Sequence, residues 1–142
     1  MNTYLFTWNP RRSPEPEMPI LANETAAGKI VRGRWSCGNT KSILKGDRVF
    51  LIRLGVEPKG IVGSGWVFKP PFKDTHWDLE KARRGLKGLF VICDWERIID
   101  MQIDSPLLLK QLPKWNSGNR NRTPQSSGFQ IPQQTANALE KL

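Results

Sequence analysis

The alternation of apolar and polar positions along the chain predicts short strands separated by turns. Residues 3–8, TYLFTW, are rich in aromatic and β-branched side chains, which is typical of a strand. Two further apolar runs, at 49–54 and 61–68, flank the sequence GVEPKG and predict an antiparallel hairpin whose turn lies at 57–59. Another strand is expected at 89–95, where the sequence is LFVICDW.

Helix signals are fewer and shorter. ETAAGKIVRG, residues 24–33, predicts a helical turn that ends near Gly28 or Gly33. In SPLLLKQLP, residues 105–113, a serine suits the N-cap and a proline suits the first helical position, so we expect a short helix. A final helix is expected to begin near Pro132.

Strands with small helices between them indicate an α+β domain built around a curved mixed or antiparallel sheet or pseudo-barrel. The length of 142 residues matches one domain, 1–142. The polar segment 116–128 is expected to be a flexible loop within it. The last helix ends abruptly at Leu142, which suggests a junction with a following domain.

Net charge points to a polyanionic partner. Lys and Arg number 22 against 13 Asp and Glu, a balance of +9 that favours nucleic acid. No apolar run approaches the roughly 20 residues of a membrane-spanning helix, and the N-terminus does not resemble a secretory signal. Cys37 and Cys93 stand far apart, as expected for reduced thiols in a cytoplasmic protein.

The motifs of most enzyme classes are missing. His76 is the only histidine, which rules out a zinc finger or an HNH nuclease centre in these residues. Neither a phosphate-binding P-loop nor a dinucleotide fingerprint occurs. Asp94 and Glu96 share a strand face, where a solvated face or an ion pair with Arg97 is the simpler interpretation than a metal site. We therefore expect a binding domain without cofactor or metal.

Tryptophan is abundant, with six residues in the chain. Three are expected in the core or at its edge: Trp66, Trp95 and Trp115. The other three stand at strand ends or in loops, beside hydroxyl, amide or carboxyl groups: Trp8, Trp35 and Trp77. Flat rings beside such groups suit a nucleobase that has left its stack, because the ring stacks on the base and the polar groups bind its edge. The polar candidates are Asn9, Ser36, Asn39, Thr75 and Asp78.

Cations surround the same three tryptophans, as phosphate contacts around a base site require. Those chosen as phosphate ligands are Arg11, Arg12, Arg32, Arg34, Lys41 and Lys73. The charged run 81–87 is interpreted as a solvated face.

The order of these motifs resembles a known family. YLFTWNP, GRWSCGN and LKGDRVFLIRLGVEPKGIVGSGWV together resemble the EVE domain of the PUA-like superfamily, which is related to the YTH domains that read N6-methyladenine in RNA. The tail PQSSGFQIPQQTANALEKL is similar to the end of the specificity domain of bacterial McrA-like, modification-dependent HNH endonucleases. Two features depart from the family: WNP replaces its Ser-Glu-Pro turn, and Arg53 stands where relatives carry an aromatic residue or histidine.

The resemblance implies a PUA-like domain that flips 5-methylcytosine or 5-hydroxymethylcytosine out of double-stranded DNA and directs a C-terminal nuclease to it. The expected base pocket is Trp8, Asn9, Trp35, Ser36, Asn39, Arg53 and Trp77. Two other functions remain open at this point. One is an RNA-binding PUA-like module that reads modified or ordinary RNA, and the other is a small enzyme or a toxin–antitoxin-type interaction module.

Overall fold

Seven strands and three helices make up the described part of the chain. The computed structural model describes residues 1–11, 15, 17–56, 59–99, 107–108 and 128–140. The strands are β1 (Thr3–Trp8), β2 (Val31–Ser36), β3 (Arg48–Arg53), β4 (Gly60–Thr75), β5 (Lys87–Ile98), β6 (Leu107–Leu108) and β7 (Phe129–Ile131). The helices are α1 (Met18–Ala26), α2 (Leu79–Arg83) and α3 (Gln133–Glu140).

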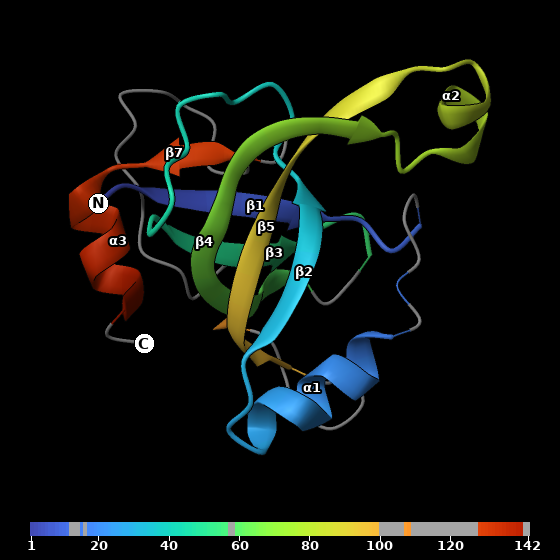
Figure 1. The fold of residues 1–142 in the computed structure, drawn as a ribbon. Helices are drawn as coiled ribbons and strands as arrows, with labels where there is room; N and C mark the ends of the chain where they lie inside the picture. The colour runs from blue at the N-terminus through green and yellow to red at the C-terminus, as the bar shows by residue number, and fades with distance from the viewer. Residues whose placement is uncertain (12–14, 16, 57–58, 100–106, 109–127, 141–142) are drawn as a thin grey trace.

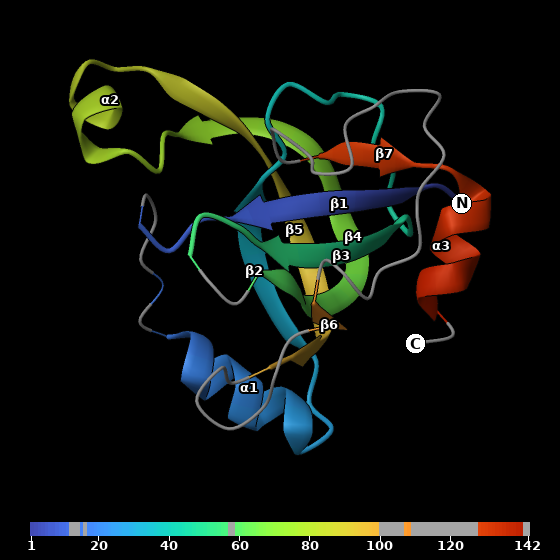
Figure 2. The same cartoon turned by 180° about the vertical axis from the view of Figure 1, so that it is seen from behind.

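All seven strands belong to one mixed sheet that curls strongly (Figures 1 and 2). α1 contributes Met18 and Ala22 to the same buried cluster as Tyr4 and Phe6, whereas α3 packs on the opposite face. The strand order is β2-β5-β4-β3-β1-β7, and β6 pairs with β4 outside this path. β1 and β3 run parallel, whereas the remaining pairs are antiparallel. The expected α+β class, with a curved mixed sheet and short flanking helices, is confirmed.

The sheet buries apolar side chains on both faces, which explains why its central strands read as continuous apolar runs. Tyr4, Phe6 and Trp8 of β1 belong to the larger cluster on the concave face, which we call the inner face. Leu5 points to the opposite face and packs in a second cluster with Leu139 of α3. β1 is therefore fixed in register by two cores at once.

Several elements lie where the sequence predicts them. β1 has the predicted bounds, β3 and β4 form the expected hairpin, and β5 and α3 are confirmed within a few residues. The turn at 57–58 lies outside the described residues. α1 begins earlier than expected but ends as predicted near Gly28, whose φ of +87° suits a residue just past a helix.

Three strands are not predicted by the sequence: β2, β6 and β7. In β2 the exposed arginines and Gly33 hide a period of two in which Val31 and Trp35 face inward. β7 directly follows the segment 116–128, which is expected to be a loop. Leu107–Leu108 of the helix expected at 105–113 form strand β6 against β4 instead. The remainder of that helix, Trp115 and nearly all of the loop at 116–128 lie outside the described residues.

β4 is much longer than predicted because it continues through Pro70 and Pro71. A proline has no N–H to give to a ladder, so it is tolerated in a strand mainly at edges and bulges. The pairing with β5 shifts register between Lys69 and Phe72, which brackets both prolines. β4 bends strongly and then extends away from the body of the molecule (Figure 1).

Arg48 joins the sheet to the C-terminal helix, a role that the sequence does not signal. Its guanidinium donates to Glu140 of α3, to Glu96 of β5 at 2.8 Å and to the Gly65 carbonyl at 3.0 Å. Its Cζ also lies 4.3 Å from the ring centre of Trp66. Trp66 was expected in the core or half-buried but is 36% exposed, whereas Trp95 is core as predicted.

Candidate nucleic-acid interface

The ends of β1 and β3 place Trp8 and Arg53 side by side. These strands are parallel, and Trp8 is the register partner of Arg53, just as Phe6 is the partner of Leu51. Because Phe6 and Leu51 both point into the inner cluster, Trp8 and Arg53 share that inner face two residues further along. The Arg53 Cζ lies 5.9 Å from the centre of the Trp8 ring. A cation and an indole therefore meet where both strands end.

Trp35, at the end of β2, reaches the same place from another part of the sheet. Its Nε1 donates a hydrogen bond of 3.2 Å to the carbonyl of Thr7, next to Trp8. Its ring meets Trp95 edge to face, with centres 6.1 Å apart. Trp35 is half-buried, so the inner cluster holds one side of the indole while the rest remains accessible. The curl of the sheet thus brings the ends of β1 and β2 together.

Asn9 follows Trp8 and is held by the chain around it. Its Oδ1 accepts a hydrogen bond of 3.0 Å from the Arg11 N–H, which forms a tight turn. A side chain at Gly55 would collide with the Asn9 amide, and Gly55 also has a positive φ of +80°. We call Trp8, Asn9, Trp35 and Arg53 the strand-end site.

Arg53 is unusual among the arginines. Its Nε is the one buried side-chain nitrogen or oxygen in the described part of the chain that has no hydrogen-bond partner. Arg32, Arg34 and Arg48 each pair with a carboxylate instead. Buried polar groups are nearly always paired, so an unpaired guanidinium nitrogen beside an aromatic ring requires an explanation.

The loop after Trp35 carries the other two candidates of this segment. Ser36 Oγ accepts a hydrogen bond from the Gly38 N–H at 3.4 Å, and Asn39 is exposed. Cys37 between them is fully buried. Burial raises the pKa of the Cys37 thiol to about 11, so it is protonated at neutral pH and unsuited to act as a nucleophile.

Trp77 lies elsewhere, on a projecting hairpin. β2 ends at Ser36 opposite Phe90, but β4 and β5 continue their pairing from there to Thr75 and Lys87. This extension together with α2, residues 73–89, is called the arm, and it projects from the body on the same side as the end of β1 (Figures 1 and 2). Trp77 is 41% exposed, and its ring lies 5.4 Å from that of His76.

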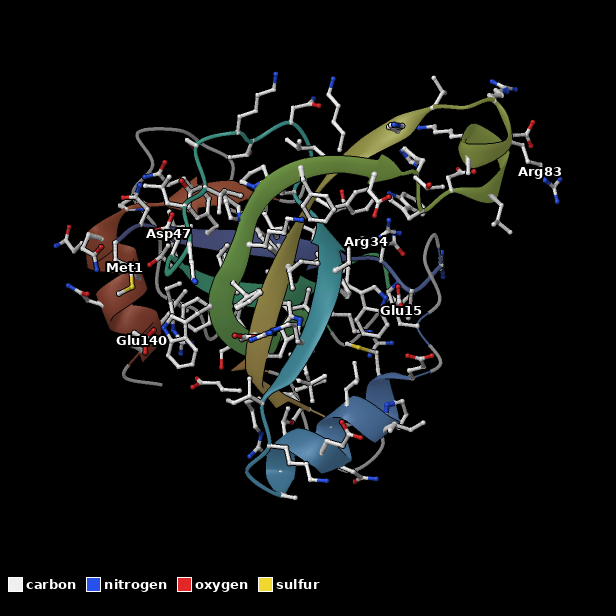
Figure 3. The ribbon with its side chains drawn as sticks, in the orientation of Figure 1. Met1, Glu15, Arg34, Asp47, Arg83 and Glu140 are labelled. Atoms are coloured by element: carbon white, nitrogen blue, oxygen red, sulfur yellow. The ribbon has the colours of Figure 1, made fainter. Side chains whose placement is uncertain are left out.

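Two of the expected phosphate ligands are already engaged in ion pairs. Arg32 binds Asp94 through two hydrogen bonds of 2.7 and 3.2 Å, and its Cζ lies 3.4 Å from the ring centre of Phe68. Arg34 binds Asp74 at 3.2 Å and the Thr75 carbonyl at 3.0 Å. Arg34 therefore ties β2 to the base of the arm, whereas Arg83 lies near the far end of the arm (Figure 3).

The other expected phosphate ligands are exposed to solvent or lie outside the described residues. Arg11, Lys41 and Lys73 are exposed, and Arg12 lies outside the described residues. The arm adds cations that the sequence suggested were a solvated face: Lys81, Arg83, Arg84 and Lys87. They are exposed, and Arg84 makes a 3.3 Å ion pair with Glu80 one helical turn earlier. Their exposure suits a solvated face and a phosphate-binding surface equally.

Asp74 is the carboxylate that pairs with Arg34 at the base of the arm. The N–H of Thr75 donates to its carboxylate at 2.8 Å and, with the Arg34 guanidinium, holds the pKa of Asp74 below its ordinary value of 3.8. The carboxylate is therefore charged at neutral pH, and the Arg34–Asp74 ion pair is intact there.

Asp94 and Glu96 do not form a metal site. They pair with Arg32 and Arg48, and no group of three or more metal-ligating side chains occurs among the described residues. None of the helices described is long and apolar enough to cross a bilayer.

Comparisons with known proteins identify structures with a similar fold but do not indicate a function. No sequence profile of a protein family matches the chain, and no curated protein matches it. Protein PSPTO5229 from Pseudomonas syringae has a similar structure, with a TM-score of 0.60 over 99% of both chains at 16% identity. A hypothetical protein from Leishmania major matches with a TM-score of 0.54 and 10% identity, over 99% of this chain and 92% of that one. At such identities the likeness concerns the fold alone.

Proposed function

We propose that this chain is an EVE-type, PUA-like domain that recognises a modified cytosine in DNA. The domain takes 5-methylcytosine or 5-hydroxymethylcytosine out of the duplex and holds it at the strand-end site. It acts in the bacterial cytoplasm as the specificity module of a modification-dependent restriction endonuclease, with the cleavage carried out by an HNH domain linked to it.

The observation that carries the proposal is the meeting of Trp8, Trp35 and Arg53 at one end of the inner face. They come from three separate strands, and nothing in the core of a small domain requires a half-buried cation there. The half-buried Trp35 provides a stacking surface for a base, and the Arg53 guanidinium provides donors for its edge. Trp8, only 9% exposed, packs in the inner cluster beside Arg53. This is the set of groups that an extruded base needs.

The surrounding charge supports a phosphate-bearing ligand. Arg11 follows the strand-end site directly, Lys41 lies in the loop after Trp35, and Lys73 begins the arm. All three side chains are exposed, so each can approach a flanking phosphate without first breaking a buried contact. Trp77 is kept in the proposal as a residue of the arm that contacts the duplex near the opened base pair.

The energetics predict modest discrimination. Burying one methyl group is worth about 1 kcal/mol, or about fivefold in affinity. Extruding a base costs a few kcal/mol, which stacking on Trp35 and the phosphate contacts must offset. Binding should therefore prefer the modified base by a small factor and weaken steeply with salt.

A binding titration with matched duplexes tests the proposal. The ligands carry cytosine, 5-methylcytosine, 5-hydroxymethylcytosine or N6-methyladenine at one position, and a single-stranded RNA completes the set. The proteins are the wild type, Trp35→Leu and, as a matched control, Trp66→Leu, because Trp66 lies on the outer face beside Arg48. Thermal melts establish that both variants fold.

We expect the wild type and Trp66→Leu to prefer a modified-cytosine duplex, and Trp35→Leu to lose that preference. Equal binding to every ligand, unchanged by Trp35→Leu, would refute the proposal. Tightest binding to the single-stranded RNA would also refute it and would favour an RNA-binding module.

A further inference from the structure

We infer that Arg53 determines which base the strand-end site accepts. It selects a base that presents two neighbouring hydrogen-bond acceptors on one edge, as cytosine does with N3 and O2, and it disfavours N6-methyladenine. The inference rests on the proposed function and adds to it a specificity-determining residue.

The first argument is that the charge of Arg53 has no carboxylate partner among the described residues. In the described part of the chain, Arg32, Arg34, Arg48 and Arg84 each lie within 4.0 Å of a carboxylate, and Arg53 does not. Its Nε is buried without a partner, and the aromatic ring of Trp8 is its neighbour. A half-buried cation without a carboxylate beside it weakens the fold, so acceptors that a ligand brings to the terminal amino groups contribute more than they would at an exposed arginine.

The second argument is position. Arg53 ends β3 on the inner face and faces Trp8 across the parallel pair, with the guanidinium carbon 5.9 Å from the ring centre. Trp8 is buried in the inner cluster and Arg53 is half-buried, so Arg53 lies between this core and solvent, where a base entering the strand-end site meets its guanidinium. The half-buried side chain covers Nε but leaves part of Arg53 in contact with solvent, so the terminal amino groups are the donors that a ligand reaches.

The third argument is the forked arrangement of N–H donors on the guanidinium. A guanidinium carries only donors, in a fixed planar arrangement that pairs with two adjacent acceptors. The pairing edge of cytosine offers O2 and N3 side by side, and modification at C5 leaves both atoms free. The corresponding edge of N6-methyladenine places an N–H donor next to its N1 acceptor, so one arm of the fork would face another donor. Arg53 thereby favours the cytosine class without reading the 5-substituent itself.

Two substitutions separate this role from a structural one. Arg53→Met keeps the length and the apolar contact with Trp8 but removes the donors, and Arg53→Lys keeps the charge but removes the fork. Because Nε has no partner in the described part of the chain, we expect Arg53→Met to melt at or above the temperature of the wild type. Lys29→Met is the matched control, since Lys29 is exposed and follows α1, outside the strand-end site.

The experiment measures affinity for duplexes carrying 5-methylcytosine and N6-methyladenine at several salt concentrations. We expect Arg53→Met and Arg53→Lys to lose about 10- to 100-fold in affinity for the 5-methylcytosine duplex, the usual value of a two-point base contact. Affinity for the N6-methyladenine duplex should hardly change. The ratio of the affinity for the 5-methylcytosine duplex to that for the N6-methyladenine duplex should therefore fall. Lys29→Met should leave the ratio as it is in the wild type.

Each other outcome overturns the inference. If Arg53→Met weakens both duplexes equally and lowers the salt dependence, Arg53 binds a phosphate. If both Arg53 variants keep the wild-type ratio, the base is selected by another residue while the proposed function stands. If the wild type itself distinguishes no base, the proposed function and this inference fall together.

Discussion

At the scale of single residues, the reactivity of the two cysteines measures how well the inner cluster excludes solvent. Cys37 and Cys93 are both fully buried, and desolvation raises both thiol pKa values, that of Cys37 from 9.0 to about 11. Neither thiol should react with iodoacetamide in the native chain at pH 8, whereas both should react once denaturant opens the core. Mass spectrometry of the labelled protein measures this, and rapid native labelling would contradict the burial.

The same pKa shift predicts a pH dependence of stability. A folded-state pKa above the unfolded one means that the folded thiol binds its proton more tightly. The contribution of Cys37 to the free energy of unfolding is therefore fully present below pH 9 and is lost as the pH rises through about 11. Urea titrations of the wild type and Cys37→Ala across this range should converge as the pH increases.

Two strand glycines should respond oppositely to the same substitution. A methyl group at Gly65 of β4 would collide with the backbone carbonyl of Asp94, whereas one at Gly33 of β2 would meet no atom within 4 Å. We expect Gly65→Ala to cost about 1–3 kcal/mol or more of unfolding free energy through overpacking. Gly33→Ala should gain about 0.5–1 kcal/mol because alanine loses less backbone entropy on folding. Destabilisation of equal size at both sites would contradict the account of Gly65.

At the scale of elements, the Arg34–Asp74 ion pair attaches the arm to β2. The Thr75 N–H and the Arg34 guanidinium both depress the pKa of Asp74. A depressed folded-state pKa means that this group stabilises the fold above its unfolded pKa and ceases to do so as the pH falls through the folded value. We expect NMR titration to place the Asp74 midpoint below 3.8 and to show it rise in Arg34→Gln. Because the Thr75 N–H remains, the rise should be partial, and an unchanged midpoint would show that the ion pair does not form.

The sequence predicts the elements that local patterns determine and misses those that pairing determines. β1 and β5 are largely apolar runs, and such a run predicts a strand without any knowledge of its pairing partner. β2 has only three inward positions, Val31, Gly33 and Trp35, and becomes a strand because β5 offers it a free edge. Leu107–Leu108 carry helix signals but pair with β4, which is a contact between distant parts of the chain.

At the scale of the whole molecule, the candidate site follows the same rule. The sequence identifies Trp8 and Trp35 as candidates because of their neighbours, and Arg53 because it departs from the family that the chain resembles. Only the curl of the sheet brings the ends of their three strands together. Trp77 looks equivalent in sequence and yet belongs to the arm beside His76. Nor does any local pattern reveal that Arg53 lacks a carboxylate partner among the described residues, since that depends on which carboxylates other strands place nearby.

The distribution of cations over the molecule predicts a directional salt dependence. Lys73 and Arg83 lie on the arm, on the side of the strand-end site, whereas Lys29 follows α1 at the opposite end of the sheet (Figure 1). Each phosphate contact removed should lower the slope of log affinity against log salt by about 0.9. We expect this fall in Lys73→Gln and Arg83→Gln and none in Lys29→Gln. An equal fall in all three would mean that the net charge of +9 acts without a defined docking face.

The central claim is that the strand-end site holds a base that has left the duplex, and fluorescence tests it most directly. A duplex carrying 2-aminopurine next to 5-methylcytosine brightens when its neighbour unstacks, so it can be titrated with the wild type and with Trp35→Leu. The account predicts a rise in fluorescence with the wild type that needs about fivefold more protein on the unmodified duplex and is abolished in Trp35→Leu. Saturable binding of the modified duplex by the wild type with no change in fluorescence would contradict it.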